Sequence, residues 1–276
     1  MKAPHIAIDG KTLRGSASPT LGPLHLVSAW ATQYHLSLGQ VAVDTKSNEI
    51  TAIPELLELL ELHGAVVTID AMGCQKAIAE KVVQKGGDYV LTVKDNQPHL
   101  LEDIQGCVAQ ALDHGVEGRD YQSHEQTERG HGREETRGYI VIPEPEGIRG
   151  QEAWPKLRVV GMCYSERTVQ GKTSSEARYF IGSKKAGARY YGRVLRDHWR
   201  IENNLHWQLD VTFDEDRSTT AERQGAENLA MLRRLALVLL KRHPDNDSLR
   251  NKRLRAGWDT DFLEEVLRGS GKSAKA

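Results

Sequence analysis

Two aspartates stand where the chain could perform metal-dependent chemistry. Asp9 ends the apolar stretch IAID, Asp70 ends the stretch VTID, and a small residue follows each of them. An aspartate at one strand end is commonly a turn former. If the two strands are neighbours, however, their carboxylates would meet at one sheet edge and repel each other unless a cation bridged them, and Mg²⁺ takes oxygen ligands of this kind. The spacing leaves a shared metal site and two ordinary turns as equal alternatives.

A third acidic candidate lies in the stretch DHWRIENNLHWQLD, residues 197–210. Written as a regular helix, His198, Glu202, His206 and Asp210 follow at intervals of four and form one polar stripe beside an apolar one. Glu202 would lie at the border of core and solvent, where a helix on a sheet could direct a carboxylate towards a strand end. The alternative is a solvated helix face. The two histidines lie two turns apart, too far to share one zinc ion.

Two tripeptides resemble part of a nucleotide-binding loop, GKT at 10–12 and GKS at 271–273. That loop requires a further glycine five residues before the second one. His5 and Val266 occupy those positions, so the sequence argues against a nucleotide site at both.

Local charge is uneven although the formal net charge is −1. Residues 189–255 carry 14 Lys or Arg against 10 Asp or Glu, whereas residues 44–70 carry one Lys against six acids. Any nucleic-acid contact must therefore come from a local patch. Cations and aromatic rings that suit phosphate contact and base stacking, or alternatively helix salt pairs and a packed core, are Arg193, Arg196, Trp199, Arg200 and Trp207.

The elements that must position these residues follow from the apolar pattern. Strands are predicted at 5–9, 24–32, 36–44, 65–70, 88–93, 157–164 and 177–181, the second and third as a hairpin. Helices are predicted at 49–63, 75–84, 98–113, 188–211, 226–242 and 260–268. The charged run around His124 and His131 is expected to be a solvated loop. This order predicts an α/β fold with one mixed sheet flanked by helices.

Composition excludes several classes of protein. Hydrophobic residues make up 39% and charged residues 27% of the 276 residues, which is ordinary for a globular chain. The three cysteines are odd in number and far apart, which argues against a disulfide framework and fits a reducing compartment. No stretch is apolar enough to span a membrane, and the N-terminus lacks a secretory signal.

Four motifs in order then give a specific resemblance. IAIDGKTLRGS, TIDAMGCQ, VKDNQP and DHWRIENNLHWQLDVTFDEDRS resemble the bacterial insertion-sequence DDE transposases of the H-repeat-associated type, and AENLAMLRRLALVLLK resembles that family's C-terminal helix. The resemblance extends from Ile6 to about Lys241. It implies a ribonuclease-H-like fold with a β-rich insertion before the last acidic helix. The catalytic domain is then expected at 1–114 and 186–276, and the insertion at 115–185.

The resemblance also implies an activity. Asp9, Asp70 and Glu202 would be the catalytic residues and would hold two Mg²⁺ or Mn²⁺ ions for phosphodiester hydrolysis and strand transfer at the ends of an insertion sequence. The expected partners are the terminal inverted repeats and target DNA, with a homodimer as the active complex in the cytoplasm, on the nucleoid. Six residues are expected to contact DNA: Lys94, Asn96, Arg200, Asn203, His206 and Trp207.

Two departures from the family pattern keep rival functions open. Related families place Tyr, Arg and Lys at set offsets around the glutamate, where this chain has Leu195, His198 and Leu209. The family's usual N-terminal region is also expected to be absent, because only four residues precede the first strand. The alternatives are a non-catalytic DNA-binding remnant of a transposase and a general metal-dependent nuclease on the same fold.

Overall fold

The computed structural model describes residues 3–43, 48–113, 121–130 and 132–269. The chain divides into two compact units, each built from two separate stretches of sequence. Unit 1 contains residues 1–8 and 61–198, and unit 2 contains residues 9–60 and 199–276. The expected boundary at 114/115 lies outside the described residues, and the division into a catalytic domain and a 115–185 insertion stays a prediction.

The strands confirm the expected fold class, a ribonuclease-H-like mixed α/β fold. Nine strands follow the hydrogen-bonded order β3-β2-β1-β4-β5-β9-β8-β7-β6. Strand β1 is parallel to β4, and β4 is parallel to β5, whereas β5 pairs antiparallel with β9. The first strand belongs to both units because the division falls between Ile8 and Asp9.

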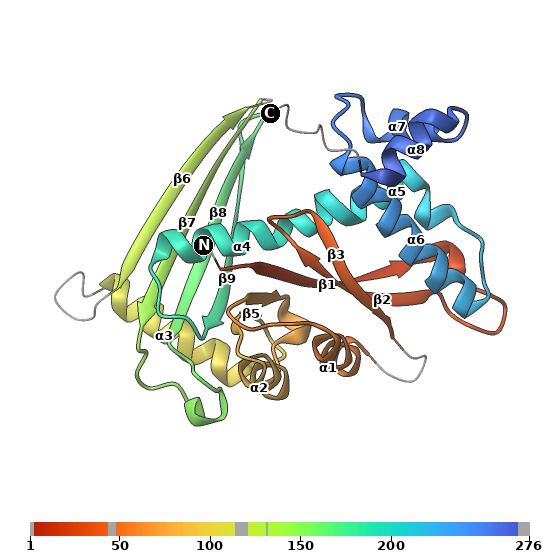
Figure 1. Cartoon of the computed structure of the whole chain (residues 1–276). Coiled ribbons are helices and arrows are strands. Elements are labelled where there is room, and N and C mark those ends of the chain that lie inside the picture. The colour runs from red at the N-terminus through yellow and green to blue at the C-terminus, as the bar shows by residue number, and fades with distance from the viewer. Residues whose placement is uncertain (1–2, 44–47, 114–120, 131, 270–276) are drawn as a thin grey trace, which may run out of the picture. The chain divides into compact units, whose positions relative to one another are not determined.

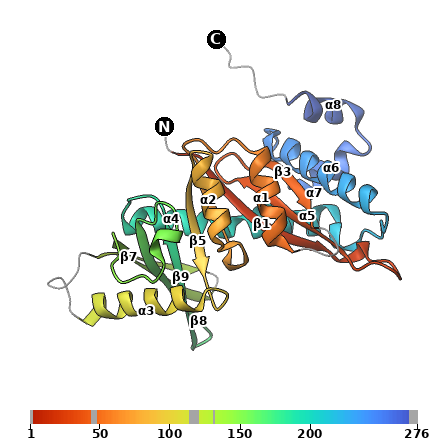
Figure 2. The same cartoon turned by 90° about the horizontal axis from the view of Figure 1, so that it is seen from below.

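Unit 1 is a sheet covered by helices (Figures 1 and 2). It contains the first residues of β1 (His5–Leu13) and six whole strands. These are β4 (Val66–Ile69), β5 (Asp88–Val93), β6 (Gln122–Gly130), β7 (Arg133–Pro143), β8 (Val159–Val169) and β9 (Lys172–Gly182). Its helices are α2 (Lys76–Gln84), α3 (Pro98–Asp113) and α4 (Ala188–Ile201). Buried Tyr191 and Val194 of α4 pack on Val90 and Phe180 of the sheet, and Figure 2 shows α3 across strands β7 to β9.

Unit 2 surrounds the edge hairpin of β2 (Leu24–Ala31) and β3 (Leu36–Ala42). Strand side chains alternate between faces: a Cβ on Gly39 of β3 would point at Leu56 of α1 (Glu49–Leu59), whereas the next residue, Gln40, donates to the Glu227 carbonyl of α6 (Arg223–Arg242). The two helices therefore cover opposite faces of the hairpin. The remaining elements are α5 (Trp207–Phe213), α7 (Leu249–Ala256) and α8 (Thr260–Arg268).

Most elements match the sequence prediction, but several differ. Strand β7 was not predicted. The region around His124 is a strand, β6, paired with β7 over its whole length, and not a solvated loop; His131 lies outside the described residues. The helix predicted over 49–63 ends at Leu59. Helix α7 was not predicted, because its sequence LRNKRLRA has almost no apolar periodicity.

Candidate active site

Asp9 lies in β1 at the start of unit 2. Its side chain is about one-fifth exposed. One oxygen, Oδ1, accepts from the Gly10 backbone N–H at 2.9 Å, and the other, Oδ2, lies 3.5 Å from Nδ1 of His206. This contact joins the predicted first catalytic aspartate to the helical segment that carries Glu202. His206, predicted to contact DNA, thus lies against Asp9.

Gly10 allows two half-buried side chains to approach the backbone of β1. A Cβ at this position would collide with the Glu49 carboxylate and would lie 2.6 Å from Nε2 of His25. His25 is itself held from both sides, by Glu49 Oε1 at 2.6 Å and by Thr12 Oγ1 at 2.8 Å. A larger residue after Asp9 would therefore require the His25–Glu49 pair to move.

Lys11 is buried, and in the sequence it stands out only as part of the GKT tripeptide, which does not form a nucleotide-binding loop. Its Nζ donates to both oxygens of Asp210 at 2.8 and 2.9 Å and to Asp216 Oδ1 at 3.2 Å. Asp9 and Lys11 share one face of β1, so the Asp9–His206 and Lys11–Asp210 pairs are two successive links to the same helix. The sequence signal for this ion pair was a single lysine within an apolar strand, together with the acidic residues of a second motif.

Glu202 begins a π-helical turn, Glu202–His206, between α4 and α5. The Trp207 N–H donates to the Glu202 carbonyl, five residues back instead of four. The turn corrects the regular helix predicted for 197–210, because the extra residue breaks the interval-of-four stripe between Glu202 and Asp210. Turns of this kind are frequent at functional sites, and this one presents the Glu202 side chain to solvent.

A lysine from α6 secures this turn. Lys241 Nζ donates to the Asn204 carbonyl at 2.6 Å and lies 5.2 Å from the centroid of the buried Trp30 ring. Burial lowers the pKa of Lys241 to about 8. Lys241 is the last residue of the AENLAMLRRLALVLLK motif, so this motif contributes directly to the conformation of the Glu202 segment.

Asp70 lies in unit 1 directly after β4. Its Oδ1 accepts from the Met72 N–H at 3.1 Å and caps the short 3₁₀ turn Ala71–Gly73. Ile69 pairs with Ile8 as the last partners of the β4–β1 register. Asp9 therefore directly follows Ile8, and Asp70 directly follows Ile69, at the end of the β1–β4 pairing.

The VKDNQP motif supports the Asp70 turn. Asn96 Nδ2 donates to the Ala71 carbonyl at 2.7 Å, and Gln97 Nε2 donates to the Cys74 carbonyl at 2.9 Å. Lys94 is exposed at the end of β5. Asn96 thus has a structural bond within unit 1, and DNA contact by Lys94 and Asn96 stays a prediction.

Two buried histidines share one threonine in the core of unit 1. His5 Nε2 and His198 Nδ1 each lie 2.8 Å from Thr68 Oγ1. Burial lowers the pKa of His5 to about 3, with the charges of His198 and Arg193 as smaller causes. Burial likewise lowers the pKa of His198 to about 4. Both rings are therefore neutral near pH 7 and join β1, β4 and α4.

The chain matches the family model of the transposase DDE domain over residues 1–239. It belongs to the DDE transposase domain family. It is 39% identical over 280 residues to the "H repeat-associated putative transposase YhhI" of Escherichia coli, covering 97% of this chain and 72% of that protein. "Putative protein YbfL" of Escherichia coli has the same identity and coverage as YhhI. "Putative transposase YncI" of Escherichia coli O157:H7 is 40% identical over 269 residues, covering 95% of this chain and 68% of that protein.

A solved structure of the piggyBac transposase synaptic complex with hairpin DNA has a TM-score of 0.39 at 10% identity. The matched region covers 100% of this chain and 59% of the piggyBac transposase chain.

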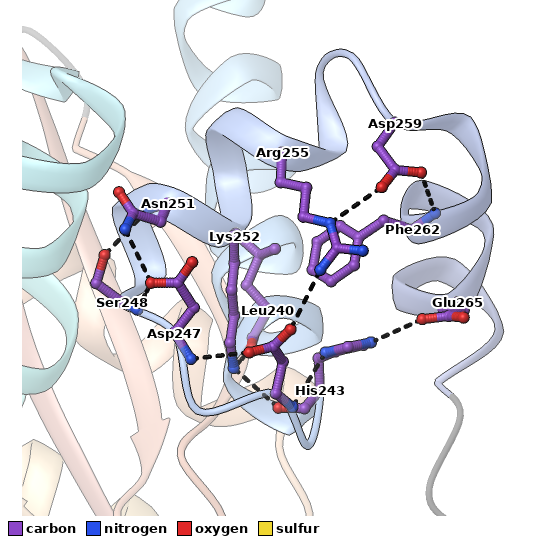
Figure 3. A network of polar contacts seen from close by, with 11 residues as sticks. Leu240, His243, Asp247, Ser248, Asn251, Lys252, Arg255, Asp259, Phe262 and Glu265 are labelled. Atoms are coloured by element: carbon purple, nitrogen blue, oxygen red, sulfur yellow. Dashed lines mark hydrogen bonds and ion pairs between the residues drawn. The ribbon is translucent and has the colours of Figure 1, made fainter.

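The polar and aromatic residues beside Glu202 differ from the cations of α7 in what they contact. Arg200, Asn203 and Trp207 are exposed beside Glu202. In contrast, Figure 3 shows that cations of α7 contact its neighbours: Lys252 donates to the carbonyls of Leu240 in α6 and of His243 after it, and Arg255 pairs with Asp259 and lies over the Phe262 ring of α8. Lys252 and Arg255 therefore contribute to the packing within unit 2.

The three carboxylates supply the hard oxygen donors that Mg²⁺ and Mn²⁺ take, so the donor type fits the family's metal ions. Asp9 and Glu202 lie in unit 2, and Asp70 lies in unit 1. Within the part of the chain that the structure describes, no group of three or more His, Cys, Asp or Glu side chains is arranged as a metal site. No helix among the described residues is long and apolar enough to cross a membrane.

Proposed function

We propose that this chain is a DNA transposase catalytic domain that cleaves and joins DNA strands at the ends of an insertion sequence. Asp9, Asp70 and Glu202 are the proposed catalytic residues and the ligands of two Mg²⁺ or Mn²⁺ ions. Bound ions would activate the attacking hydroxyl and stabilise the leaving oxygen of an in-line displacement at phosphorus. The partners would be terminal-repeat and target DNA, and the active complex a homodimer on the nucleoid.

One observation carries this proposal: residues of every motif make contacts that act on the segments that bear the three carboxylates. The β1–β4 register ends one residue before Asp9 and Asp70. In unit 2, the Asp9–His206 and Lys11–Asp210 pairs and the Lys241–Asn204 bond act on the segment that begins at Glu202. Preorganised carboxylates are what two-ion phosphoryl chemistry requires.

The exposed residues beside Glu202 would bind the substrate strand. Arg200 would contact phosphate, and the Trp207 ring offers a face for base stacking. Asn203 on the same turn, and Lys94 after β5, would add polar contacts to the backbone.

The test is Mn²⁺-dependent cleavage of a duplex carrying the terminal repeat that flanks this gene. Asp9→Asn and Glu202→Gln are expected to abolish cleavage, whereas Glu55→Gln, at an exposed carboxylate on α1, should retain it. Full activity in both site variants would overturn the assignment.

The same assay separates the alternatives. Cleavage followed by joining to target DNA supports a transposase, and cleavage of any duplex without joining supports a general nuclease. Salt-dependent binding without cleavage identifies a DNA-binding remnant.

A further inference from the structure

Unit 2 has an apolar groove that has no part in the chemistry proposed above. It encloses about 450 Å³ between β3 and α6. Met231 and Leu235 on α6 are 54% and 55% exposed, and Leu38 of β3 lies opposite them. Large apolar side chains gathered at this exposure mark an interaction surface.

Strand β3 adds an open backbone edge to the groove. It is the last strand at its end of the sheet order. Its sequence, LSLGQVA, contains no charged residue and no proline, although proteins usually place such residues on exposed edges to prevent pairing with another chain. The edge therefore suits pairing with a further strand.

The pattern along α6 indicates which partner fits. At about 100° per residue, Glu227, Met231, Leu235, Val238 and Arg242 lie within one stripe roughly 80° wide. The stripe is acidic at its N-terminal end, apolar in the middle and basic at its C-terminal end. Turned antiparallel against itself about a two-fold axis near Leu235, it places each Glu227 opposite an Arg242 and the apolar residues opposite one another.

We propose that a second copy of this chain docks here, with α6 packed antiparallel against its counterpart and the two β3 edges side by side. A two-fold interface requires one self-complementary patch. Helices on the same face of a sheet continued through both β3 strands would lie about 10 Å apart, which is a normal packing distance. This proposal rests on the homodimer of the proposed function and specifies its interface. Its test measures the oligomeric state of the chain and not DNA cleavage.

The test is the molar mass of the full chain in solution, by light scattering after gel filtration. We expect a dimer for the wild type and a monomer for Leu235→Glu, because a carboxylate would enter the apolar middle of the interface. Leu59→Glu, on another exposed leucine, in α1 and outside the groove, is the control and should remain dimeric.

A charge exchange excludes misfolding as the explanation. Glu227→Arg alone would oppose two arginines and is expected to weaken the dimer at least tenfold, whereas Glu227→Arg combined with Arg242→Glu should restore it. A monomeric wild type, or a dimer insensitive to both Leu235→Glu and Glu227→Arg, would overturn the proposal. DNA cleavage is measured separately, so a failed dimer test and a failed activity test remain distinguishable.

Discussion

At the scale of single residues, the family motifs are sets of mutually dependent contacts. In DGKT, residues 9–12, the aspartate faces His206, the glycine makes room for Glu49, the lysine holds Asp210 and the threonine holds His25. Alternation along β1 sends these contacts to two opposite faces. The motif therefore tolerates little change at any of its four positions.

Gly10→Ala should destabilise unit 2 by about 1–3 kcal/mol, because the added methyl group must displace the His25–Glu49 pair or shift β1. Gly106→Ala, in α3 where a Cβ would meet nothing within 4 Å, should stabilise by about 0.5–1 kcal/mol. Thermal unfolding of both variants measures the difference. Equal melting temperatures would contradict the packing described for Gly10.

Lys11→Met should cost about 1–3 kcal/mol, since it leaves the half-buried Asp210 and Asp216 carboxylates without their buried cation. Arg14 also pairs with Asp216, at 3.5 Å, but its side chain is 82% exposed. Arg14→Met should therefore change the unfolding free energy by less than about 1 kcal/mol. Urea denaturation of the two variants side by side tests whether burial, and not charge alone, makes Lys11 important.

At the scale of elements, the sequence predicted most strands and helices correctly but could not predict the π-helical turn. The spacing of Ile201, Leu205 and Leu209 fits a regular α-helix, and the extra residue is stabilised by Lys241, which lies 37 positions from Asn204. Helix α7 was missed for a similar reason, since its cations bind distant carbonyls and rings. Long-range contacts of this kind leave no local periodicity to detect.

Lys241→Met should loosen the turn that carries Glu202, because the Asn204 carbonyl loses its donor. We expect faster amide hydrogen exchange over 202–207 and a loss of cleavage of at least about tenfold, since misplacement of a catalytic group is costly. Arg250→Met, at an exposed cation of α7, serves as the control for lost charge. Unchanged exchange in the turn would show that Lys241 does not secure it.

The His5–Thr68–His198 network makes the stability of unit 1 depend on pH. Both pKa values lie below the 6.5 of an unfolded histidine, at about 3 and about 4. Below pH 6.5 the unfolded chain therefore binds more protons than the folded one, and the unfolding free energy falls as the pH drops towards 4. His198→Asn should flatten this slope in melting curves between pH 7 and pH 4.5, and a slope as steep as that of the wild type would contradict the assignment.

At the scale of the whole chain, a net charge of −1 limits how DNA can be held. Many cations are committed to internal contacts, so few phosphates can be neutralised and the salt dependence of binding should be shallow. Arg200→Gln should lower the slope of log K against log salt by about one. Arg268→Gln, at a cation paired with Glu264 on α8, should leave the slope unchanged in fluorescence anisotropy titrations.

The division of the chain inside β1 has a consequence for its synthesis on the ribosome. Residues 9–60 belong to the same unit as residues 199–276, and the 138 residues of 61–198 separate them. At 5–20 residues per second, translation of that interval takes roughly 7–28 s. During this time the nascent β2–β3 hairpin lacks α6, which has not yet been synthesised, and its uncharged edge is open to pairing with other chains. Chaperone capture during elongation would shield this hairpin, and slow codons between 61 and 198 would lengthen its exposure.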